Sequence, residues 1–280
     1  MSLQTGSSGP DVQALQNQLI KLGYSLTADG SYGPQTAAAV MQFQAAHHLQ
    51  QDGIAGPVTQ SVINAALNTT SVYGIDVSVY QGAINWDAVK ASGSVNFAYI
   101  KCTDGDTTVD PRFASNLAEA KRVGMVYGAY HFFRFLTSDP LKQAALLKAT
   151  AGPANFGTGT LPIAVDVEYQ DKNGTTNATV TQNRAQYAAD LLAFVNQVTA
   201  DFGRPPVLYT TADFWNNVLM SPPGFNNLKL WIAQYSAAPT IPHGWTNYSM
   251  WQYGSTGTIS GITGAVDLDV VSGGMSGLVG

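Results

Sequence analysis

Two carboxylates at the end of an apolar segment are the most informative residues for chemistry in this chain. Glutamate occurs twice in 280 residues, at Glu119 and Glu168, against sixteen aspartates. Glu119 lies in the helix-like segment NLAEAKR and is interpreted as a surface charge, whereas Glu168 ends the apolar run LPIAVDVEY, two residues after Asp166. Residues i and i+2 of a strand point to the same face, and charge beside apolar residues is costly without a partner or a purpose. Asp166 and Glu168 are therefore the leading catalytic candidates.

Three further aspartates lie in strand-like segments. Asp76 ends YGIDVS, and Asp267 and Asp269 lie in AVDLDVV. Acidic residues at the C-terminal ends of barrel strands form active mouths. Converging carboxylates raise one another's pKa, so one can stay protonated beside an ionised partner, as glycoside hydrolysis requires. The alternatives are a cap or turn role for Asp76, a cation bound by Asp267 and Asp269, and a structural anion, metal site or surface feature for the DxE pair.

Aromatic residues give a second indication. They lie in or near the ends of the predicted strands, at Tyr130, His131, Phe132, Tyr209, Trp231, Tyr235, Trp251 and Tyr253. Aromatic faces stack on the apolar faces of sugar rings, and the polar tips of Tyr and Trp can bond hydroxyl groups. Strands are rich in aromatic residues in any case, so we expect about half of these to be core.

Other catalytic types fit the sequence poorly. The histidines His47, His48, His131 and His243 show no HExxH or other ligand spacing, and GxSxG and GxxxxGK[ST] motifs do not occur. Cys102 with His131 is a formal nucleophilic pair, but a cysteine in an apolar strand is more often a packing residue. We expect neither a metal nor a cofactor.

The segments that carry these residues predict an α/β fold. Eight apolar, strand-like segments occur at 72–78, 96–102, 125–133, 161–169, 206–211, 228–235, 248–253 and 265–271. Helix-like segments lie between several of them, at 111–124, 138–152 and 181–203. Such apolar runs suit strands buried on both faces, and the alternation predicts a parallel sheet. Eight strands predict a compact (β/α) barrel, made irregular because the last strands leave little room for helices.

The N-terminal segment predicts a separate helical unit. Its near-repeat reads DGSYGPQT at Asp29–Thr36 and DGIAGPVT at Asp52–Thr59. Apolar residues at spacings of three and four flank these loops, and Pro10, Pro34 and Pro57 suit the first turns of three helices. A short polar segment follows. The expected organisation is a three-helix domain at 1–67, a linker at 68–71 and the barrel at 72–280.

Composition narrows the class of protein. Charged residues make up only 11% of the chain and the net charge is −5, so we expect no nucleic-acid partner bound through phosphates. The one cysteine excludes an intrachain disulfide and a Cys-rich zinc site. Neither a membrane-spanning run nor a basic amphipathic helix is present, and we expect a monomer. The start MSLQTGSSG lacks the basic and apolar parts of a signal peptide.

In combination, the segments of residues 72–272 resemble the glycoside hydrolase family 25 lysozymes, the muramidases of bacteria, phages and fungi. The resemblance rests on YGIDVSVYQGAINW, FAYIKCTDG, GAYHFFRF, DVE, VLYTT, LWIAQY, MWQY and VDLD, in that order. It implies a flattened, irregular (β/α) barrel. It also implies cleavage of the β-1,4 bond from N-acetylmuramic acid to N-acetylglucosamine in peptidoglycan.

The resemblance also implies roles for individual residues. Glu168 matches the family's general acid and Asp166 its partner carboxylate, which acts as nucleophile or orients the substrate's acetamido group. The acidic positions of the first and last strands fall on Asp76 and Asp267. Aromatic groove positions fall on Tyr130, Trp231 and Trp251, and we expect Tyr209 beside them.

One motif departs from the family pattern. Cys102 and Asp104 stand where the family commonly has Ala and Glu. Asp104 is one methylene shorter than glutamate, and we expect it to contribute to the positioning of the substrate.

The N-terminal unit resembles the peptidoglycan-binding type 1 domain. The matching segments are DVQALQNQLIKLGY, DGSYGPQTAAAVMQFQ and DGIAGPVT. This resemblance implies that glycan strands of peptidoglycan are the partner, and that the protein acts at the bacterial cell wall. A phage endolysin released by a holin, a bacterial autolysin exported by another route and a chain whose leader has been removed all fit this expectation.

Two alternatives to a muramidase stay open at this point. The first is a wall-binding protein without turnover, against which the intact set of four acids argues. The second is a glycosidase of another amino-sugar polymer such as chitin.

Overall fold

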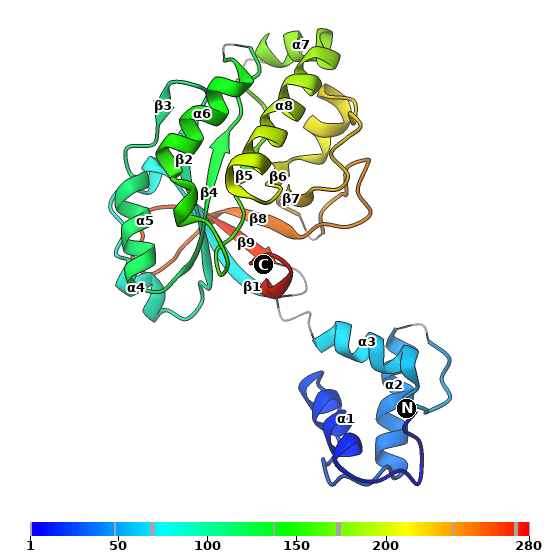
Figure 1. The fold of residues 1–280 in the computed structure, drawn as a ribbon. Helices are drawn as coiled ribbons and strands as arrows, with labels where there is room; N and C mark the ends of the chain where they lie inside the picture. The colour runs from blue at the N-terminus through cyan, green and yellow to red at the C-terminus, as the bar shows by residue number, and fades with distance from the viewer. Residues whose placement is uncertain are drawn as a thin grey trace. The chain divides into compact units, whose positions relative to one another are not determined.

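The chain folds as two compact units, Met1–Thr70 and Ser71–Gly280 (Figure 1). The computed structural model describes residues 2–47, 49–67, 71–136, 138–171, 175–236, 238–271 and 274–279. His48 and positions 68–70 of the expected linker lie outside the described residues.

The N-terminal unit consists of three helices, as predicted. They are α1 (Pro10–Lys21), α2 (Pro34–Ala46) and α3 (Pro57–Leu67). Each begins at a proline, because the fixed φ and missing N–H of proline suit the first helical turn. The buried core of this unit comprises Val12, Leu15, Leu19, Tyr32, Ala39, Val40, Phe43, Ala55 and Ile63.

Two buried glutamines explain the near-repeat. The side-chain amide of Gln16 donates to Asp29, to the Ser31 carbonyl and to Thr36, and its carbonyl accepts from the Gly30 N–H. Gln44 makes the same four contacts with the second loop, at Asp52, Ile54, Thr59 and Gly53. Each DGxxGPxT loop is thus folded around one glutamine from the preceding helix.

The second unit is a closed barrel of eight strands. They are β1 (Val72–Val77), β2 (Phe97–Asp104), β4 (Val126–Phe132), β5 (Ala164–Asp166), β6 (Val207–Thr210), β7 (Lys229–Ala233), β8 (Met250–Gly257) and β9 (Val266–Val271). The sheet order is β1-β9-β8-β7-β6-β5-β4-β2, and pairing of β1 with β2 closes the barrel. The short β3 (Thr108–Val109) forms a hairpin with β2. All eight predicted strands are present.

The prediction of a parallel sheet is wrong for one strand. β9 runs antiparallel to both of its neighbours, β8 and β1, while the other barrel pairs are parallel. Only residues 258–265 connect β8 to β9. A connection this short can make a hairpin but not the crossover that parallel strands require.

Helices pack on the outside of the barrel (Figure 1). They are α4 (Trp86–Ala91), α5 (Phe113–Arg122), α6 (Pro140–Ala151), α7 (Thr175–Gln182) and α8 (Arg184–Phe202). The three longest were predicted, whereas α4 and α7 are too short for a clear periodicity. Short helical turns complete the unit at η1 (Val79–Gln81), η2 (Pro153–Asn155), η3 (Phe214–Val218) and η4 (Met275–Gly277). Only η3 lies between β6 and β7, so the barrel is irregular as expected.

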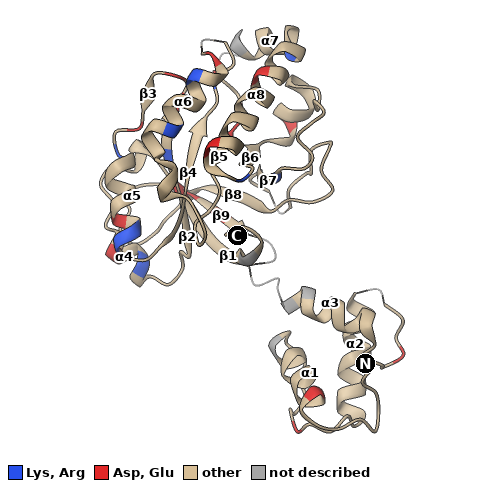
Figure 2. Ribbon diagram, viewed as in Figure 1, with Lys and Arg blue, Asp and Glu red and all other residues tan. Residues whose placement is uncertain are grey.

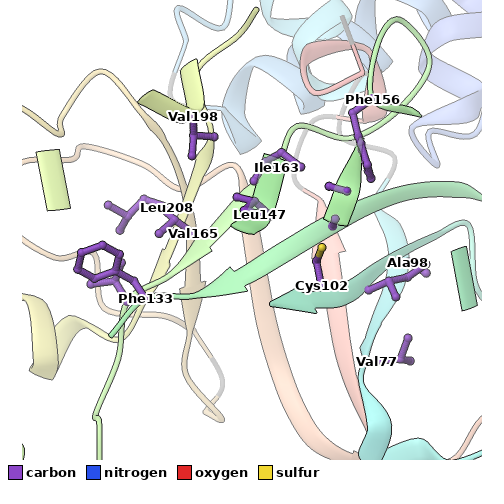
Figure 3. Close-up of a cluster of buried hydrophobic side chains, with 14 of the residues drawn as sticks. Val77, Ala98, Cys102, Phe133, Leu147, Phe156, Ile163, Val165, Val198 and Leu208 are labelled. Carbon is purple, nitrogen blue, oxygen red and sulfur yellow. The ribbon is translucent and has the colours of Figure 1, made fainter. Parts of the chain in front are cut away.

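The barrel strands bury both faces. Along β2, Ala98, Ile100 and Cys102 belong to the cluster between sheet and helices, while Phe97 and Tyr99 belong to the cluster inside the barrel. Figure 3 shows Cys102 among the apolar side chains of the outer cluster. This placement supports a packing role for the cysteine.

The outer surface carries few charges. In Figure 2 the Lys, Arg, Asp and Glu residues are scattered mainly over the outer helices. Among the described residues, no helix is both long enough and apolar enough to span a membrane.

Candidate active site

A cleft of about 920 Å³ opens at the end of the barrel where the parallel strands terminate. Eight of the nine predicted site residues line it, namely Asp76, Asp104, Tyr130, Asp166, Glu168, Tyr209, Trp231 and Asp267. The ninth, Trp251, is not among the lining residues of the described chain. Acids in or just after β1, β2, β5 and β9 therefore converge on a single cleft.

The DxE pair lies where β5 ends. Asp166 is the last residue of β5, so Glu168 lies two residues beyond the strand rather than in it. The chain nevertheless stays extended, because the Val167 N–H donates to the Tyr209 carbonyl at 2.9 Å. Val167 packs in the outer core and is fully buried. Asp166 and Glu168, on either side of it, both face the cleft.

Burial raises the proton affinity of both members of this pair. The pKa of Asp166 lies well above its usual value, through burial and the adjacent charge of Glu168. Burial also raises the pKa of Glu168, and the charge of Lys101 opposes the shift. One oxygen of Asp166, Oδ1, is buried and has no hydrogen-bond partner among the described residues. The pair can therefore hold a proton for transfer.

The other two acids come from adjacent antiparallel strands. Asp76 and Asp267 are register partners in the β1–β9 pair, so their side chains lie on one face. Because β9 is reversed, its second residue, Asp267, and not its C-terminal end, reaches the cleft. Burial and the charge of Asp267 raise the pKa of Asp76 to about 8. Burial likewise raises the pKa of Asp267.

A glutamine on β8, Gln252, holds Asp76 through a hydrogen bond. The Gln252 side-chain amide donates to Asp76 Oδ2 at 2.6 Å. The carbonyl of the same glutamine accepts from the hydroxyls of Tyr209 and Tyr235, at 2.9 and 2.8 Å. These contacts fix the orientation of the amide and favour the ionised form of Asp76.

Asp104 is ion-paired rather than free. Arg134 donates to both of its oxygens, at 2.6 and 3.0 Å, and Lys101 lies 3.5 Å away. Burial opposes ionisation of Asp104, but these hydrogen bonds and charges outweigh it and lower its pKa. Arg134 also lies over the Phe132 ring, 4.3 Å from its centroid. Asp104 is therefore suited to holding these cations at the cleft wall, not to proton transfer.

The predicted aromatic residues have different environments. Trp231 is only 2% exposed and stacks on Tyr99 inside the barrel, so most of its surface serves the core. Tyr235, in contrast, lines the cleft and is 58% exposed. Its exposed ring is available for stacking on a sugar.

Trp251 is not among the described residues that line the cleft. Its indole N–H donates to the Gln234 carbonyl at 2.8 Å. Its ring packs against Tyr248 and Tyr253. The role of Trp251 at the groove stays a prediction, without a cleft contact to support it.

Sequence reasoning missed several polar residues of the cleft, three of which make the contacts described above. Lys101, Arg134 and Gln252 all line it. The signal was present for two of them, since Lys101 and Gln252 are polar residues inside the apolar segments FAYIKC and YSMWQY. A lone polar side chain in an apolar strand indicates a buried contact, because unpaired burial is costly.

The alternative nucleophilic pair is not formed. Cys102 is fully buried, and burial raises the pKa of its thiol. Both ring nitrogens of His131 are occupied, Nδ1 by Thr103 at 2.8 Å and Nε2 by Gln143 at 3.0 Å. Burial lowers the pKa of His131 to about 4, so the imidazole is neutral. The structure supports packing and hydrogen-bonding roles for these two residues.

The alternative cation site also lacks support. Asp269 is fully buried below the cleft, and its Oδ1 accepts from the Trp231 indole N–H at 2.9 Å. No group of three or more His, Cys, Asp or Glu residues in the described chain is arranged to hold a metal ion.

A (β/α) barrel with converging carboxyl groups and aromatic side chains in one cleft is the architecture of a glycoside hydrolase. Comparison with known proteins identifies the family. The sequence model of glycosyl hydrolases family 25 matches residues 75–262, and that of the putative peptidoglycan binding domain matches residues 8–63. The chain belongs to glycosyl hydrolase family 25, and it is a cell-wall lytic glycosidase of the lysozyme type.

Individual relatives agree with this assignment. Lysozyme M1 of Streptomyces globisporus is 35% identical over 221 residues, which cover 78% of this chain and 73% of that protein. The crystal structure of the bacterial lysozyme from Streptomyces coelicolor superimposes with a TM-score of 0.68 at 35% identity, covering 75% of this chain and 96% of that one. A family 25 lysozyme structure from Aspergillus fumigatus gives 0.64 at 31% identity, covering 74% and 97%.

Proposed function

We propose that this enzyme hydrolyses the β-1,4 bond between N-acetylmuramic acid and N-acetylglucosamine, with Glu168 as the general acid. The observation that carries the proposal is the convergence of Asp76, Asp166, Glu168 and Asp267 on one cleft. Buried carboxyl groups with raised pKa values supply the proton that the leaving oxygen needs. The names of the relatives, lysozymes among them, support peptidoglycan as the substrate.

The partner role falls to Asp166. Asp166 and Glu168 are two residues apart and face the same cleft, which suits adjacent functions better than attack from opposite faces of the sugar. Asp166 lines the cleft, and its Oδ1 is buried without a partner among the described residues. The closeness of the two residues favours a mechanism in which Asp166 orients the substrate's own acetamido group over one in which it attacks the anomeric carbon.

The remaining acids would support this reaction. Asp76, held by Gln252, and Asp267, its register partner, would bind the acetamido group or a water molecule and tune the pKa of the acid. Tyr235 would supply a stacking face for the sugar. The N-terminal unit would hold the enzyme on glycan strands, and the protein would act as a monomer at the cell wall.

The test compares the two glutamates of the chain. Glu168→Gln should reduce the release of reducing ends from purified cell walls by at least about 100-fold, since general acid catalysis contributes roughly 10²–10⁴-fold. The matched control is Glu119→Gln, because Glu119 pairs with Arg122 on the exposed face of α5. The control should match the wild-type rate.

Three outcomes would contradict the proposal. Near-wild-type activity of Glu168→Gln would exclude Glu168 as the acid. Binding to walls without release of reducing ends by the wild type would identify a non-catalytic wall-binding protein. Preferential cleavage of chitin oligomers, or mass spectra without muramic acid at the new reducing ends, would identify a different glycosidase.

A further inference from the structure

Asp269 is a buried carboxyl group directly below the cleft that the proposed mechanism does not use. It lies two residues after Asp267 on β9, so both side chains project to the same side of the sheet. Its register partners are Gly74 on β1 and Gln252 on β8. Asp269 therefore lies diagonally across from Asp76, one layer deeper in the barrel, and is 0% exposed.

The two oxygens of Asp269 have different surroundings. Oδ1 accepts from the Trp231 indole N–H at 2.9 Å. Oδ2 is buried and receives no N–H or hydroxyl donor from the described residues. Burial and the charge of Asp76, its diagonal neighbour across the β1–β9 pair, raise the pKa of Asp269. Two neighbouring ionised carboxylates repel one another, and a buried oxygen without a partner is costly. One proton between the two groups removes both penalties.

The contacts of Asp76 place this proton on Asp269. Asp76 Oδ2 already accepts from the fixed amide of Gln252 at 2.6 Å, which stabilises the ionised form. Asp269 is the more deeply buried of the two, and burial disfavours charge most strongly there. The aspartates that face Asp269 are Asp76 and Asp267, and they raise its proton affinity further. Two tyrosines, Tyr99 and Tyr253, also lie in the electrostatic field of Asp269. Burial and the charge of Asp269 raise their pKa values, so both are neutral.

We propose that Asp269 is a protonated positioning residue, which donates a hydrogen bond to Asp76 and fixes the orientation of that side chain at the floor of the cleft. Trp231 anchors the acid through its indole N–H, and its own ring is fixed by stacking on Tyr99 with centroids 4.7 Å apart. Substrate would then meet Asp76 as a preorganised acceptor. The kinetic part of this inference rests on the proposed muramidase function.

Two substitutions separate a protonated acid from an ionised one. In Asp269→Asn, the amide oxygen can accept from Trp231 while the amide N–H donates to Asp76, so the protonated state is copied. In Asp269→Leu, the branching at Cγ is retained without the donor. Asp269→Asn should keep kcat within about 3-fold of wild type, whereas Asp269→Leu should lose at least about 10-fold in kcat with a smaller change in KM. Asp190→Asn, on the outer helix α8, serves as the control and should show wild-type rates.

The pH profile and the stability supply readouts that a merely structural role would not move. Activity of Asp269→Asn should extend to higher pH than that of wild type, because the amide has no proton to lose. A carboxyl group whose pKa is raised by folding binds more protons in the folded state, so stability falls as pH rises above the unfolded pKa. The melting temperature of Asp269→Asn relative to wild type should therefore rise by roughly 5 °C between pH 5 and pH 8.

The outcomes are distinguishable. If Asp269→Asn loses as much kcat as Asp269→Leu while both remain folded, or if its relative melting temperature is the same at both pH values, Asp269 is not protonated. Full activity of Asp269→Leu would exclude a positioning role. An inactive wild type would instead disprove the muramidase function, and the melting temperatures alone would then decide the protonation of Asp269.

Discussion

Single residues set the proton affinity of the cleft, and Lys101 is the main opposing charge. Burial raises the pKa of Asp166 and of Glu168, and Lys101 lowers both. Its ammonium group is held 3.5 Å from Asp104 and lies over the Phe132 ring, 5.1 Å from the centroid. A fixed cation beside coupled carboxyl groups determines the pH range in which one is protonated and another is ionised.

Replacement of Lys101 by methionine should move the pH optimum of wall hydrolysis to higher pH. Without the cation, the pKa values of Asp166 and Glu168 rise further, so both limbs of the pH–rate profile shift upward, by roughly one unit. Initial rates of reducing-end release between pH 4 and pH 9 measure this shift. Lys142→Met, on the outer helix α6, is the control and should leave the profile unchanged. A shift of the Lys101 variant to lower pH would contradict the electrostatic role.

At the scale of elements, one reversed strand completes the site. β9 enters between β8 and β1 as the second arm of a hairpin. Its first residues therefore reach the cleft, and Asp267 and Asp269 face Asp76 from one side. A parallel strand would have put its first residues at the opposite end of the barrel. In the N-terminal unit, the determining feature is the buried glutamine that α1 and α2 each contribute to the loop following them.

Replacement of Gln44 by leucine should destabilise the N-terminal unit by roughly 2–4 kcal/mol. Four hydrogen bonds to the Asp52–Thr59 loop are lost, and buried partners are left unsatisfied. Gln42→Leu is the matched control, because Gln42 lies on the same helix and is exposed. Denaturant unfolding of the isolated residues 1–70, followed by circular dichroism, compares the two variants. Equal stabilities would show that the glutamine does not fold the loop.

At the scale of the whole molecule, two units with separate cores share one chain. One matches a peptidoglycan-binding family and the other a family of glycosidases. Linked modules that bind the same polymer raise the local concentration of the catalytic cleft around its bonds, without any contact between them.

A chain of residues 71–280 should therefore lose activity only on the polymer. On intact cell walls at low wall concentration, its rate should fall by roughly 10-fold or more relative to the full chain. On soluble glycan oligomers the two rates should agree, because no second site is engaged. Turbidity loss and oligomer cleavage measure the two cases. Equal losses on both substrates would indicate damage to the barrel rather than loss of tethering.

The sequence by itself determined the elements and the identity of the acids. The eight strands, the three N-terminal helices and the pair Asp166 and Glu168 follow from periodicity, proline placement and turn residues, which act over a few neighbouring positions. Asp76 and Asp267 follow from their places in strand-like segments, and the family motifs added their roles. These features are local in the chain, and the fold did not have to be known to find them.

Only the tertiary structure decided which face of each later strand points inward and which distant groups share a proton. Alternation puts Trp251 and Gln252 on opposite faces of β8, but closure of the barrel turned the glutamine inward to Asp76, 176 residues away in sequence. The same closure buried Trp231 and brought Asp269 against Asp76. Such contacts depend on strand direction and register summed around the barrel, and the short-range pattern of a single strand does not contain that information.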